Sequence, residues 1–249
     1  MISKNNLKYI KSLQLKKIRV AENRFLVEGA KSVLEVLDSN FTIHQLLCTE
    51  SFASTNNILL NNKEINKEIS TEQELSDIGN FATNNTAIAV VEMKTNKILL
   101  PAEKEYILLL DNIADPGNLG TIIRIADWYG INKIIASENT AEIYNPKVIA
   151  SSMGSFTRVN IFYTSLENYL KENKTYIYAA RLEGESIHNT SFTRTGGMVL
   201  MGNESHGIDK VLYAFVDEFV FIPRYGLAES LNVGVATAVF CDKIRQQIG

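Results

Sequence analysis

Residues 222–238 carry the strongest chemical signal in this chain and read I-P-R-Y-G-L-A-E-S-L-N-V-G-V-A-T-A. Pro223 and Gly226 predict a turn, because proline fixes φ and glycine tolerates a positive φ. A helix with Ser230 as its N-cap is expected to follow, and its few polar residues predict burial on most sides. Asn232 would then lie one turn into an apolar helix, where its carboxamide needs bound partners. Those partners are either ordinary structural hydrogen bonds or a ligand.

A second segment, D-P-G-N-L-G-T-I-I-R at 115–124, places Asn118 near the start of a predicted helix. Gly120 lies where a backbone can approach a ligand closely, and Arg124 lies about one and a half turns further along. Arg124 either acts on a ligand, or pairs with Asp127 at i+3 or stacks on Trp128 at i+4. The segment alone favours the second interpretation.

A third segment reads V-L-M-G-N-E-S-H-G-I-D at 199–209. It presents Asn203 and Glu204 on a glycine-flanked turn after an apolar strand. A carboxylate at the end of a buried strand needs a partner, whereas one on a turn exposed to water needs none. Both interpretations remain open.

Other catalytic and metal-binding patterns are absent from the sequence. The three histidines have no nearby Ser/Asp or ligand-spaced pattern, so a hydrolytic triad is not indicated. Cys48 and Cys241 are far apart and form no CxxC, so neither zinc nor a disulfide framework is expected. Gly117-Asn-Leu-Gly120 lacks the third glycine of a dinucleotide fingerprint. We expect no bound metal.

Composition fits a protein with a substantial core and a charged N-terminal segment. The chain has 249 residues, of which 45% are hydrophobic and 21% charged, enough for one large domain or two small ones. It shows no leader and no apolar run long enough to span a membrane, so a soluble, cytoplasmic protein is expected. Residues 1–31 hold eight Lys/Arg against two Glu, while the whole chain carries −3. This basic segment suits either a polyanionic partner or an ordinary solvated helix face.

The elements that would position these segments fall into two units. Residues 1–95 are expected to form a small α/β domain. Its elements are a basic amphipathic helix over 4–18, strands over 25–27, 43–48 and 87–92, a helix near 30–37, and a helix opened by the capping box Thr71-x-x-Glu74. Residues 96–104, which are polar and include Pro101, are the expected linker.

Residues 105–249 are expected to form a larger α/β domain. Its predicted strands are 106–110, 133–136, 160–163, 176–180, 197–201 and 218–222, and its predicted helices are 119–129, 146–152, 166–171 and the C-terminal helix. Strand and helix alternation with nearly continuous apolar strands predicts an open, mostly parallel sheet. Ligands bind beyond the carboxyl ends of such strands. That rule selects the loops 111–118, 180–186, 202–207 and 223–230.

Three of these segments, taken together, indicate one protein family far more specifically than any of them does alone. N-L-G-T-I-I-R at 118–124, L-M-G-N-E-S-H-G-I at 200–208 and I-P-R-Y-G-L-A-E-S-L-N-V-G-V-A at 222–236 closely resemble the three ordered motifs of the SpoU/TrmH-type RNA 2′-O-ribose methyltransferases, within the SPOUT superfamily. R-F-L-V-E-G at 24–29 resembles, more loosely, the ribosomal-protein-like substrate-binding domain that many members carry in front. Gly234 stands where many members have Ser, and Arg224 where Met is common.

The resemblance implies an RNA-binding domain over 1–95 and, over 105–249, a methyltransferase domain tied in a trefoil knot and working as a homodimer. It implies S-adenosylmethionine as the cofactor, held mainly by backbone groups. The implied cofactor-binding residues are Ala180, Leu200, Met201, Gly202, Asn203, Ile222, Leu231 and Asn232.

By the same resemblance, Arg124 would activate the ribose hydroxyl. Arginine is almost always protonated, so we favour a role in positioning the hydroxyl and stabilising developing negative charge. Asn118 and Glu204 would shape the pocket, and Ser230 and Asn232 would hold Arg124 and the knot loop. The side chains expected to bind RNA are Lys16, Lys17, Arg19, Arg24 and Lys31.

The predicted function is therefore methyl transfer to a ribose 2′-hydroxyl, in 23S ribosomal RNA rather than tRNA because of the separate N-terminal domain. A tRNA substrate is the alternative within the same chemistry. A non-catalytic RNA-binding or ribosome-assembly protein of the same fold is the alternative from another class. The intact motif residues count against it. A nucleotide-dependent oxidoreductase is less well supported, because the glycine fingerprint is missing.

Overall fold

A computed structural model describes residues 2–61, 65–80, 85–193 and 195–248. The chain divides into two compact units. The first comprises residues 1–95 and 144–157, and the second comprises 96–143 and 158–249. The short segment 144–157 thus belongs with the N-terminal unit, a grouping that the sequence did not suggest. None of the described helices is both long and apolar enough to cross a membrane.

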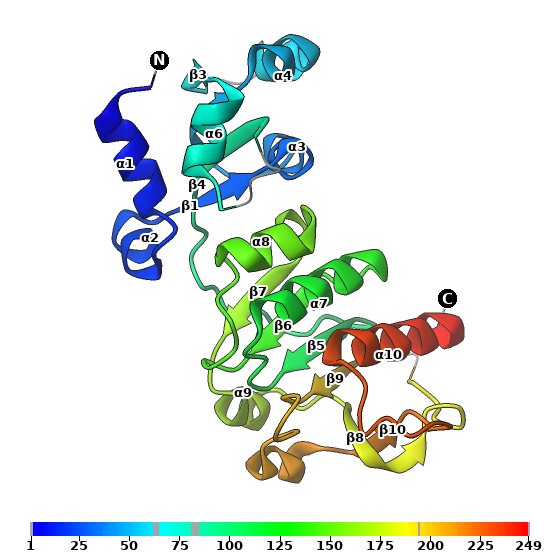
Figure 1. Ribbon diagram of the computed structural model, residues 1–249. Coiled ribbons are helices and arrows are strands. Elements are labelled where there is room, and N and C mark those ends of the chain that lie inside the picture. The colour runs from blue at the N-terminus through cyan, green and yellow to red at the C-terminus, as the bar shows by residue number, and fades with distance from the viewer. Residues whose placement is uncertain (1, 62–64, 81–84, 194, 249) are drawn as a thin grey trace. The chain divides into compact units, whose positions relative to one another are not determined.

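The first unit is built on a four-stranded sheet of order β1-β4-β2-β3 (Figure 1). Antiparallel pairing joins β4 to β1 and β2, and β3 runs parallel to β2. Its strands are β1 (Arg24–Glu28), β2 (Ile43–Cys48), β3 (Lys67–Ile69) and β4 (Ala87–Glu92). Its helices are α1 (Lys4–Ser12), α2 (Lys16–Glu22), α3 (Ala30–Leu37), α4 (Glu50–Thr55), α5 (Asn57–Asn61), α6 (Glu72–Ile78), α8 (Pro146–Ser152) and the short 3-10 turn η1 (Ser155–Thr157).

The N-terminal helix predicted over 4–18 is wrong as a single element, because the structure has two helices, α1 and α2. Helix α1 ends at its C-cap Leu13, whose side chain is fully buried, and α2 begins at Lys16. The side chain of Arg19, in α2, reaches back to the junction between the two helices and is 2% exposed. Its guanidinium donates to the carbonyl oxygens of Leu13 at 3.2 Å and Gln14 at 2.7 Å. A charge counted in the sequence as a surface residue thus binds the backbone of the helix junction.

Aromatic packing explains why the segment 144–157 belongs to this unit. The ring of Tyr144 lies 4.5 Å from that of Phe25, measured between centroids. Phe156 contacts both Phe25 and Phe41, at 6.0 and 5.8 Å. The Tyr144 hydroxyl also accepts a hydrogen bond from the backbone amide of Lys94. Buried rings contribute much of the apolar area that stabilises a small domain, so residues 144–157 complete this core.

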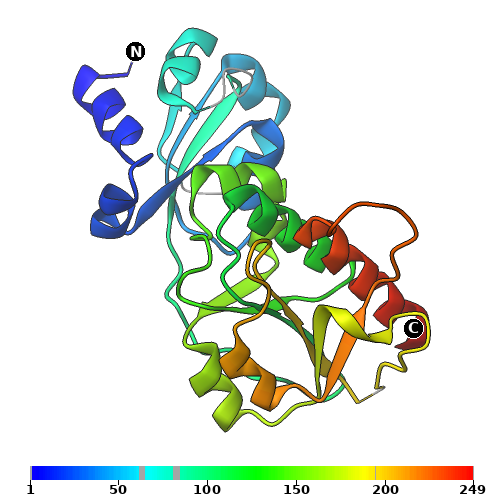
Figure 2. The ribbon, with the colours of Figure 1, turned by 60° about the horizontal axis from the view of Figure 1, so that its bottom comes forward.

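The second unit is a six-stranded parallel sheet of order β10-β8-β9-β5-β6-β7, which confirms the predicted open parallel architecture. Its strands are β5 (Tyr106–Leu110), β6 (Lys133–Ala136), β7 (Asn160–Tyr163), β8 (Ile177–Ser186), β9 (Gly197–Met201) and β10 (Glu218–Phe221). Its helices are α7 (Pro116–Trp128), α9 (Leu166–Glu172), α10 (Val233–Ile248) and the 3-10 helix η2 (Lys210–Phe215). Figures 1 and 2 show α7 beside α10 on one face of the sheet and α9 beside η2 on the other.

Strand β8 is longer and less regular than the predicted strand 176–180. Its pairing with β10 shifts register, so that Ala179 pairs with Phe219 while Glu185 pairs with the next residue, Val220. Residues 180–184 therefore do not pair with β10 and form an excursion, a segment that bulges out of the sheet between the two paired parts of β8. Gly184 has φ of +142°, and a Cβ there would lie 2.1 Å from the Phe219 carbonyl oxygen, so only glycine fits.

The buried position of Arg19 makes a stability prediction. Arg19→Ala is expected to lower the free energy of unfolding by about 2 kcal/mol, because it leaves buried carbonyl groups without donors. Lys17→Ala, two residues away and exposed, removes the same charge and is expected to change it by less than about 0.5 kcal/mol. Urea unfolding of the two variants compares them directly. Equal stabilities would show that Arg19 has no structural role.

Candidate functional site

The candidate site lies at the carboxyl end of the second sheet, where the strand order reverses. Strands β5 and β9 are neighbours, with β6 and β7 on one side and β8 and β10 on the other. Because all six strands are parallel, the loops that follow β5 and β9 emerge side by side at the same edge. Such a reversal leaves a crevice in which ligands of open α/β sheets bind. The loops 111–118 and 202–207, both selected from the sequence, meet there.

Helix α7 presents Asn118 at this edge. Asp115 is the N-cap of α7, and its carboxylate accepts a hydrogen bond from the Asn118 amide at 2.9 Å. Pro116 at the first helical position needs no hydrogen-bond acceptor. The helix therefore starts three residues before the predicted 119, and Asn118 lies in its first turn with its side chain directed by the cap.

A chain of side-chain hydrogen bonds joins the three sequence motifs at Asn118. Its carboxamide nitrogen donates to the Glu204 carboxylate, and its carboxamide oxygen accepts from the Asn232 carboxamide at 2.9 Å. A carboxylate only accepts, so the orientation of both amides follows from Glu204. Three side chains far apart in the sequence are thus held together. We call this hydrogen-bonded series, Glu204–Asn118–Asn232, the Asn118 chain.

Asn232 itself is the N-cap of α10. Its side-chain oxygen accepts from the amides of Gly234 at 2.9 Å and Val235 at 3.3 Å. The prediction that Ser230 caps this helix is therefore wrong, because α10 begins at Val233. The prediction that Asn232 is buried one turn into the helix is wrong for the same reason, since the side chain is exposed at the helix start. Val235 is 51% exposed, so the start of α10 is also less buried than predicted.

The turn after β9 is held in a tight shape that presents Glu204 to Asn118. The Asn203 carboxamide accepts from the amides of Ser205 and His206 and donates to the Asn112 carbonyl at 2.8 Å. Asn203 and Gly207 also pair through two backbone hydrogen bonds of 2.9 Å. A Cβ on Gly202 would lie 2.5 Å from the Gly207 carbonyl carbon, so the close approach requires glycine there.

Asp111, which sequence reasoning missed, ties this turn to β5. It is 9% exposed, and its carboxylate accepts from the Asp209 amide at 2.7 Å. Burial raises the pKa of the Asp111 carboxyl above its ordinary value, an effect that the Asp209 hydrogen bond opposes. The available signal was an aspartate directly after a buried apolar strand, a costly position unless a donor meets it.

Arg124 and Ser230, the other two predicted catalytic residues, are not joined to the Asn118 chain. Both are exposed, and the side chain of neither forms a hydrogen bond or ion pair within the described residues. The alternative partners considered for Arg124 are otherwise engaged or exposed. Asp127 binds the Arg158 guanidinium at 2.9 and 3.0 Å, and Trp128 is 82% exposed. Arg124 is therefore a free cation on the surface of α7.

The predicted cofactor-binding residues fall at one edge of three adjacent strands. Ala180 starts the excursion of β8, Leu200 and Met201 end β9, and Ile222 follows β10. Their strands neighbour one another in the order β10-β8-β9, so their carboxyl ends lie together. Gly202 and Asn203 belong to the turn after β9. Leu231, which is 50% exposed, and Asn232 lie just before α10. Backbone groups and apolar side chains of this kind suit a nucleoside-containing cofactor.

Comparison with known proteins decides the family. The sequence matches the SpoU rRNA Methylase family over residues 105–242, more than half of the chain. The chain belongs to the SpoU rRNA methylase family. Residues 4–89 match the MRM3-like substrate binding domain, in agreement with the predicted role of the first unit.

The chain is similar to several named rRNA methyltransferases. The 23S rRNA (guanosine(2553)-2′-O)-methyltransferase RlmP of Bacillus subtilis is 30% identical over 238 residues, which cover 94% of each chain. The 23S rRNA (guanosine-2′-O-)-methyltransferase RlmB of Neisseria meningitidis is 28% identical over 75% of this chain and 78% of its own length. The AdoMet-bound rRNA methyltransferase from Sinorhizobium meliloti superposes with a TM-score of 0.89 at 26% identity, covering 100% of this chain and 98% of its own.

The packing around Gly234 explains locally why a residue without a side chain suits this position. A Cβ on Gly234 would lie 3.0 Å from the Thr121 methyl carbon and 3.1 Å from the Asn232 side-chain oxygen. The Thr121 hydroxyl is bound to the Gly117 carbonyl, which directs the methyl group toward α10. Thr121 thus fills the space that a larger residue at 234 would need.

This packing predicts a coupling between positions 121 and 234. Gly234→Ala is expected to cost about 1 kcal/mol of stability, because the added methyl crowds Thr121 and the N-cap oxygen. In a Thr121→Ser background the crowding methyl is absent, and the same change is expected to be neutral or stabilising, as alanine is the better helix former. A double-mutant cycle measured by urea unfolding tests this. An equal effect of Gly234→Ala in both backgrounds would contradict it.

Proposed function

We propose that this chain is an S-adenosylmethionine-dependent RNA methyltransferase that transfers a methyl group to a ribose 2′-hydroxyl of ribosomal RNA. The Asn118 chain is the observation that supports this most directly. It brings one residue of each of the three motifs, Asn118, Glu204 and Asn232, into contact at the crevice of the sheet. The substrate class is supported by the names of the relatives, which include 23S rRNA methyltransferases.

The cofactor is proposed to bind at the ends of β8, β9 and β10. Backbone groups at Ala180, Gly202 and Ile222 line this edge, and Leu231 offers an exposed apolar side chain. When bound there, S-adenosylmethionine supplies an electrophilic methyl group on a sulfonium centre. Nothing in this edge requires a metal, and within the described residues no group of three or more metal-ligating side chains occurs.

Arg124 is proposed to position the ribose hydroxyl and to stabilise negative charge on its oxygen as the proton leaves. The guanidinium is free of partners among the described residues and carries planar donors that suit an oxyanion or a phosphate. A guanidinium has donors and no acceptor, so the proton passes to another group, such as an RNA phosphate. Asn118 and Glu204 fix the adjacent loops, and Asn232 fixes the start of α10.

A homodimer is proposed because large apolar side chains lie exposed in the segment that leads into the site. Tyr225, Leu227 and Leu231, before α10, are 90%, 100% and 50% exposed. Exposed apolar side chains gathered in one short segment suit an interaction surface. A partner subunit that covers them would also supply contacts to Arg124 and Ser230. Light scattering at twice the 27.9 kDa chain mass is the expected result.

The proposal includes the trefoil knot and a cytoplasmic location expected from the sequence. Support for the knot comes from the last helix, α10, which packs on α7, the first helix of the second unit, rather than beyond the edge strand β10. The chain must therefore return across the sheet after its edge strand.

RNA is proposed to bind the first unit through exposed basic side chains. Lys16, Lys17 and Lys31 are exposed, and Arg24 is half-buried with its guanidinium on the Tyr9 hydroxyl at 2.9 Å. Arg19, predicted with them, is left out because its guanidinium is buried against the helix junction. Such lysines give affinity that does not depend on base sequence and falls with salt.

Arg124 variants test the function. With in vitro transcribed 23S rRNA and radiolabelled S-adenosylmethionine, Arg124→Ala is expected to lower the rate of methyl transfer by at least about 100-fold. Arg124→Lys is expected to recover little of it, because lysine keeps the charge and loses the planar donors. Calorimetric titration is expected to show the same cofactor affinity for all three proteins.

Three outcomes would contradict parts of this proposal. A rate near wild type for Arg124→Lys would exclude the geometric role of the guanidinium. Methylation of tRNA but not of 23S rRNA would move the substrate to the tRNA alternative. A folded wild-type protein that binds RNA but not S-adenosylmethionine would favour the non-catalytic RNA-binding or ribosome-assembly alternative.

A further inference from the structure

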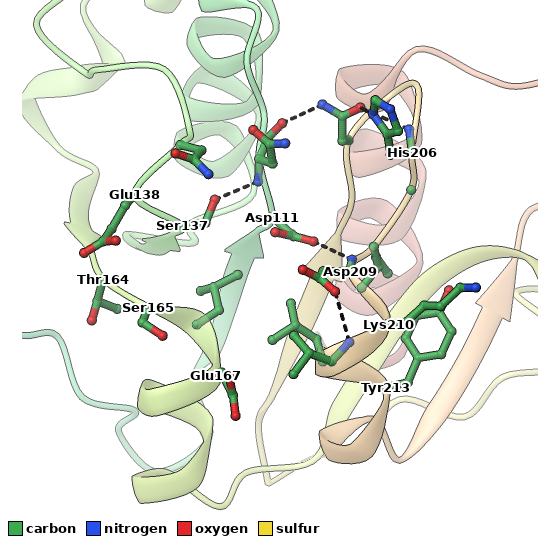
Figure 3. Close-up of a pocket in the computed structure, with 18 residues that line it drawn as sticks. Asp111, Ser137, Glu138, Thr164, Ser165, Glu167, His206, Asp209, Lys210 and Tyr213 are labelled. Carbon is green, nitrogen blue, oxygen red and sulfur yellow. Dashed lines mark hydrogen bonds between the residues drawn. The ribbon is translucent and has the colours of Figure 1, made fainter.

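A cavity of about 560 Å³ opens at the carboxyl ends of β5, β6, β7 and β9. Figure 3 shows Ser137, Glu138, Thr164 and Ser165 on one side of it and His206, Asp209 and Lys210 on the other, with Asp111 between the two groups. It therefore occupies the crevice where the strand order reverses, between the loops that follow β5 and β9. Its volume falls within the range of about 300–1,000 Å³ that ligand sites occupy.

This cavity is distinct from the proposed cofactor edge. Of the residues proposed to hold the cofactor, only Asn203 lines it, while Ala180, Ile222 and Leu231 do not. It nevertheless borders the Asn118 chain, because Asn203 directly precedes Glu204 and the Asn203 carboxamide is bound to Asn112, another residue of the lining. A ligand in the cavity would thus lie beside the Asn118 chain without replacing the cofactor.

The charges of the lining favour hydrogen-bond donors over phosphate. Glu138, Asp111 and Asp209 form no ion pair within the described residues, and Lys210 is the one lysine of the lining. A fourth carboxylate, Glu167, is paired with Lys171 at 2.6 Å. One oxygen of Asp111 accepts the Asp209 amide at 2.7 Å, which leaves its other oxygen for a further donor.

The lining also offers apolar surface and neutral acceptors. Val211, which is 46% exposed, lines the cavity, and the buried side chains of Leu166, Ile208 and Leu212 pack in the core beneath it. The hydroxyls of Thr164 and Ser165 lie on the Glu138 side. Apolar surface with carboxylate and hydroxyl acceptors matches a flat heterocycle whose edge carries N–H groups, whereas a phosphodiester would meet uncompensated carboxylates.

We propose that this cavity binds one base of the RNA substrate, drawn out of its stack, and that it prefers guanine. Guanine carries N1–H and N2–H₂ donors side by side on one edge, so a single carboxylate accepts both, whereas no other standard base offers two adjacent donors there. The inference rests on the proposed RNA methyltransferase function and adds base selection by Glu138 and Asp111. Extruded bases in proteins are read in this way, through their Watson–Crick edge.

Nucleoside binding to the full-length protein tests the inference. With the cofactor site saturated by S-adenosylhomocysteine, guanosine is expected to give a saturable signal in ligand-observed NMR. Inosine, which lacks the N2 amino group, is expected to bind about tenfold more weakly. Glu138→Gln and Asp111→Asn remove a charge with little change of shape and are each expected to weaken guanosine binding about tenfold. Glu172→Gln, an exposed residue of α9 outside the lining, is the matched control and is expected to leave binding unchanged.

The outcomes separate this inference from the function on which it rests. Equal binding of guanosine and inosine would contradict the proposed guanine preference of the cavity. Undiminished guanosine binding by both Glu138→Gln and Asp111→Asn would also contradict it. So would an active enzyme that does not bind guanosine. Loss of guanosine signal on addition of S-adenosylhomocysteine would assign the cavity to the cofactor. Absence of cofactor binding and of methyl transfer in the wild-type protein would instead overturn the proposed function. In transfer assays on 23S transcripts, Glu138→Gln is expected to raise KM about tenfold with unchanged cofactor affinity.

Discussion

The two-sided hydrogen bonding of the Asn118 carboxamide is the interaction on which the geometry of the site depends. An amide has a donor end and an acceptor end, so it can join a carboxylate to a second amide, which neither a carboxylate nor a hydrocarbon can do. Glu204 takes the donor end, and Asn232 takes the acceptor end. Because Asn232 also caps α10, the start of the last helix is fixed by the first turn of α7.

Parallel strand geometry supplies the setting for these hydrogen bonds. Each motif follows a strand, and all six strands of the second unit end at one edge. Backbone constraints then aim the side chains. Asp115 starts α7, Asn203 closes the turn that carries Glu204, and Asp111 ties that turn to β5. The result is a hydrogen-bonded polar centre that borders an open cavity, an arrangement that suits a site whose substrate approaches from solution.

Local signals in the sequence predicted most elements and the three motif positions. The apolar strands, the Thr71 capping box and the parallel alternation are read from adjacent residues, and the structure confirms them. Three of the failures required knowledge of distant contacts. Ser230 and Asn232 are both good caps, and only the Asn118 partner across the fold selects Asn232. Arg19 resembles a surface charge until the break between α1 and α2 buries it. The aromatic partner of Tyr144, Phe25, lies more than a hundred residues earlier in the chain.

An exchange of hydrogen-bonding groups between positions 118 and 204 tests the central claim most directly. The N118D variant places two carboxylates together, and it is expected to lower the free energy of unfolding by about 2 kcal/mol. Adding E204Q supplies a donor at position 204 for the carboxylate at position 118. The account predicts that the double variant regains at least about 1 kcal/mol over N118D in urea unfolding, a favourable coupling between the two positions. Strictly additive effects of the two substitutions would show that Asn118 and Glu204 do not act together, and would contradict the account.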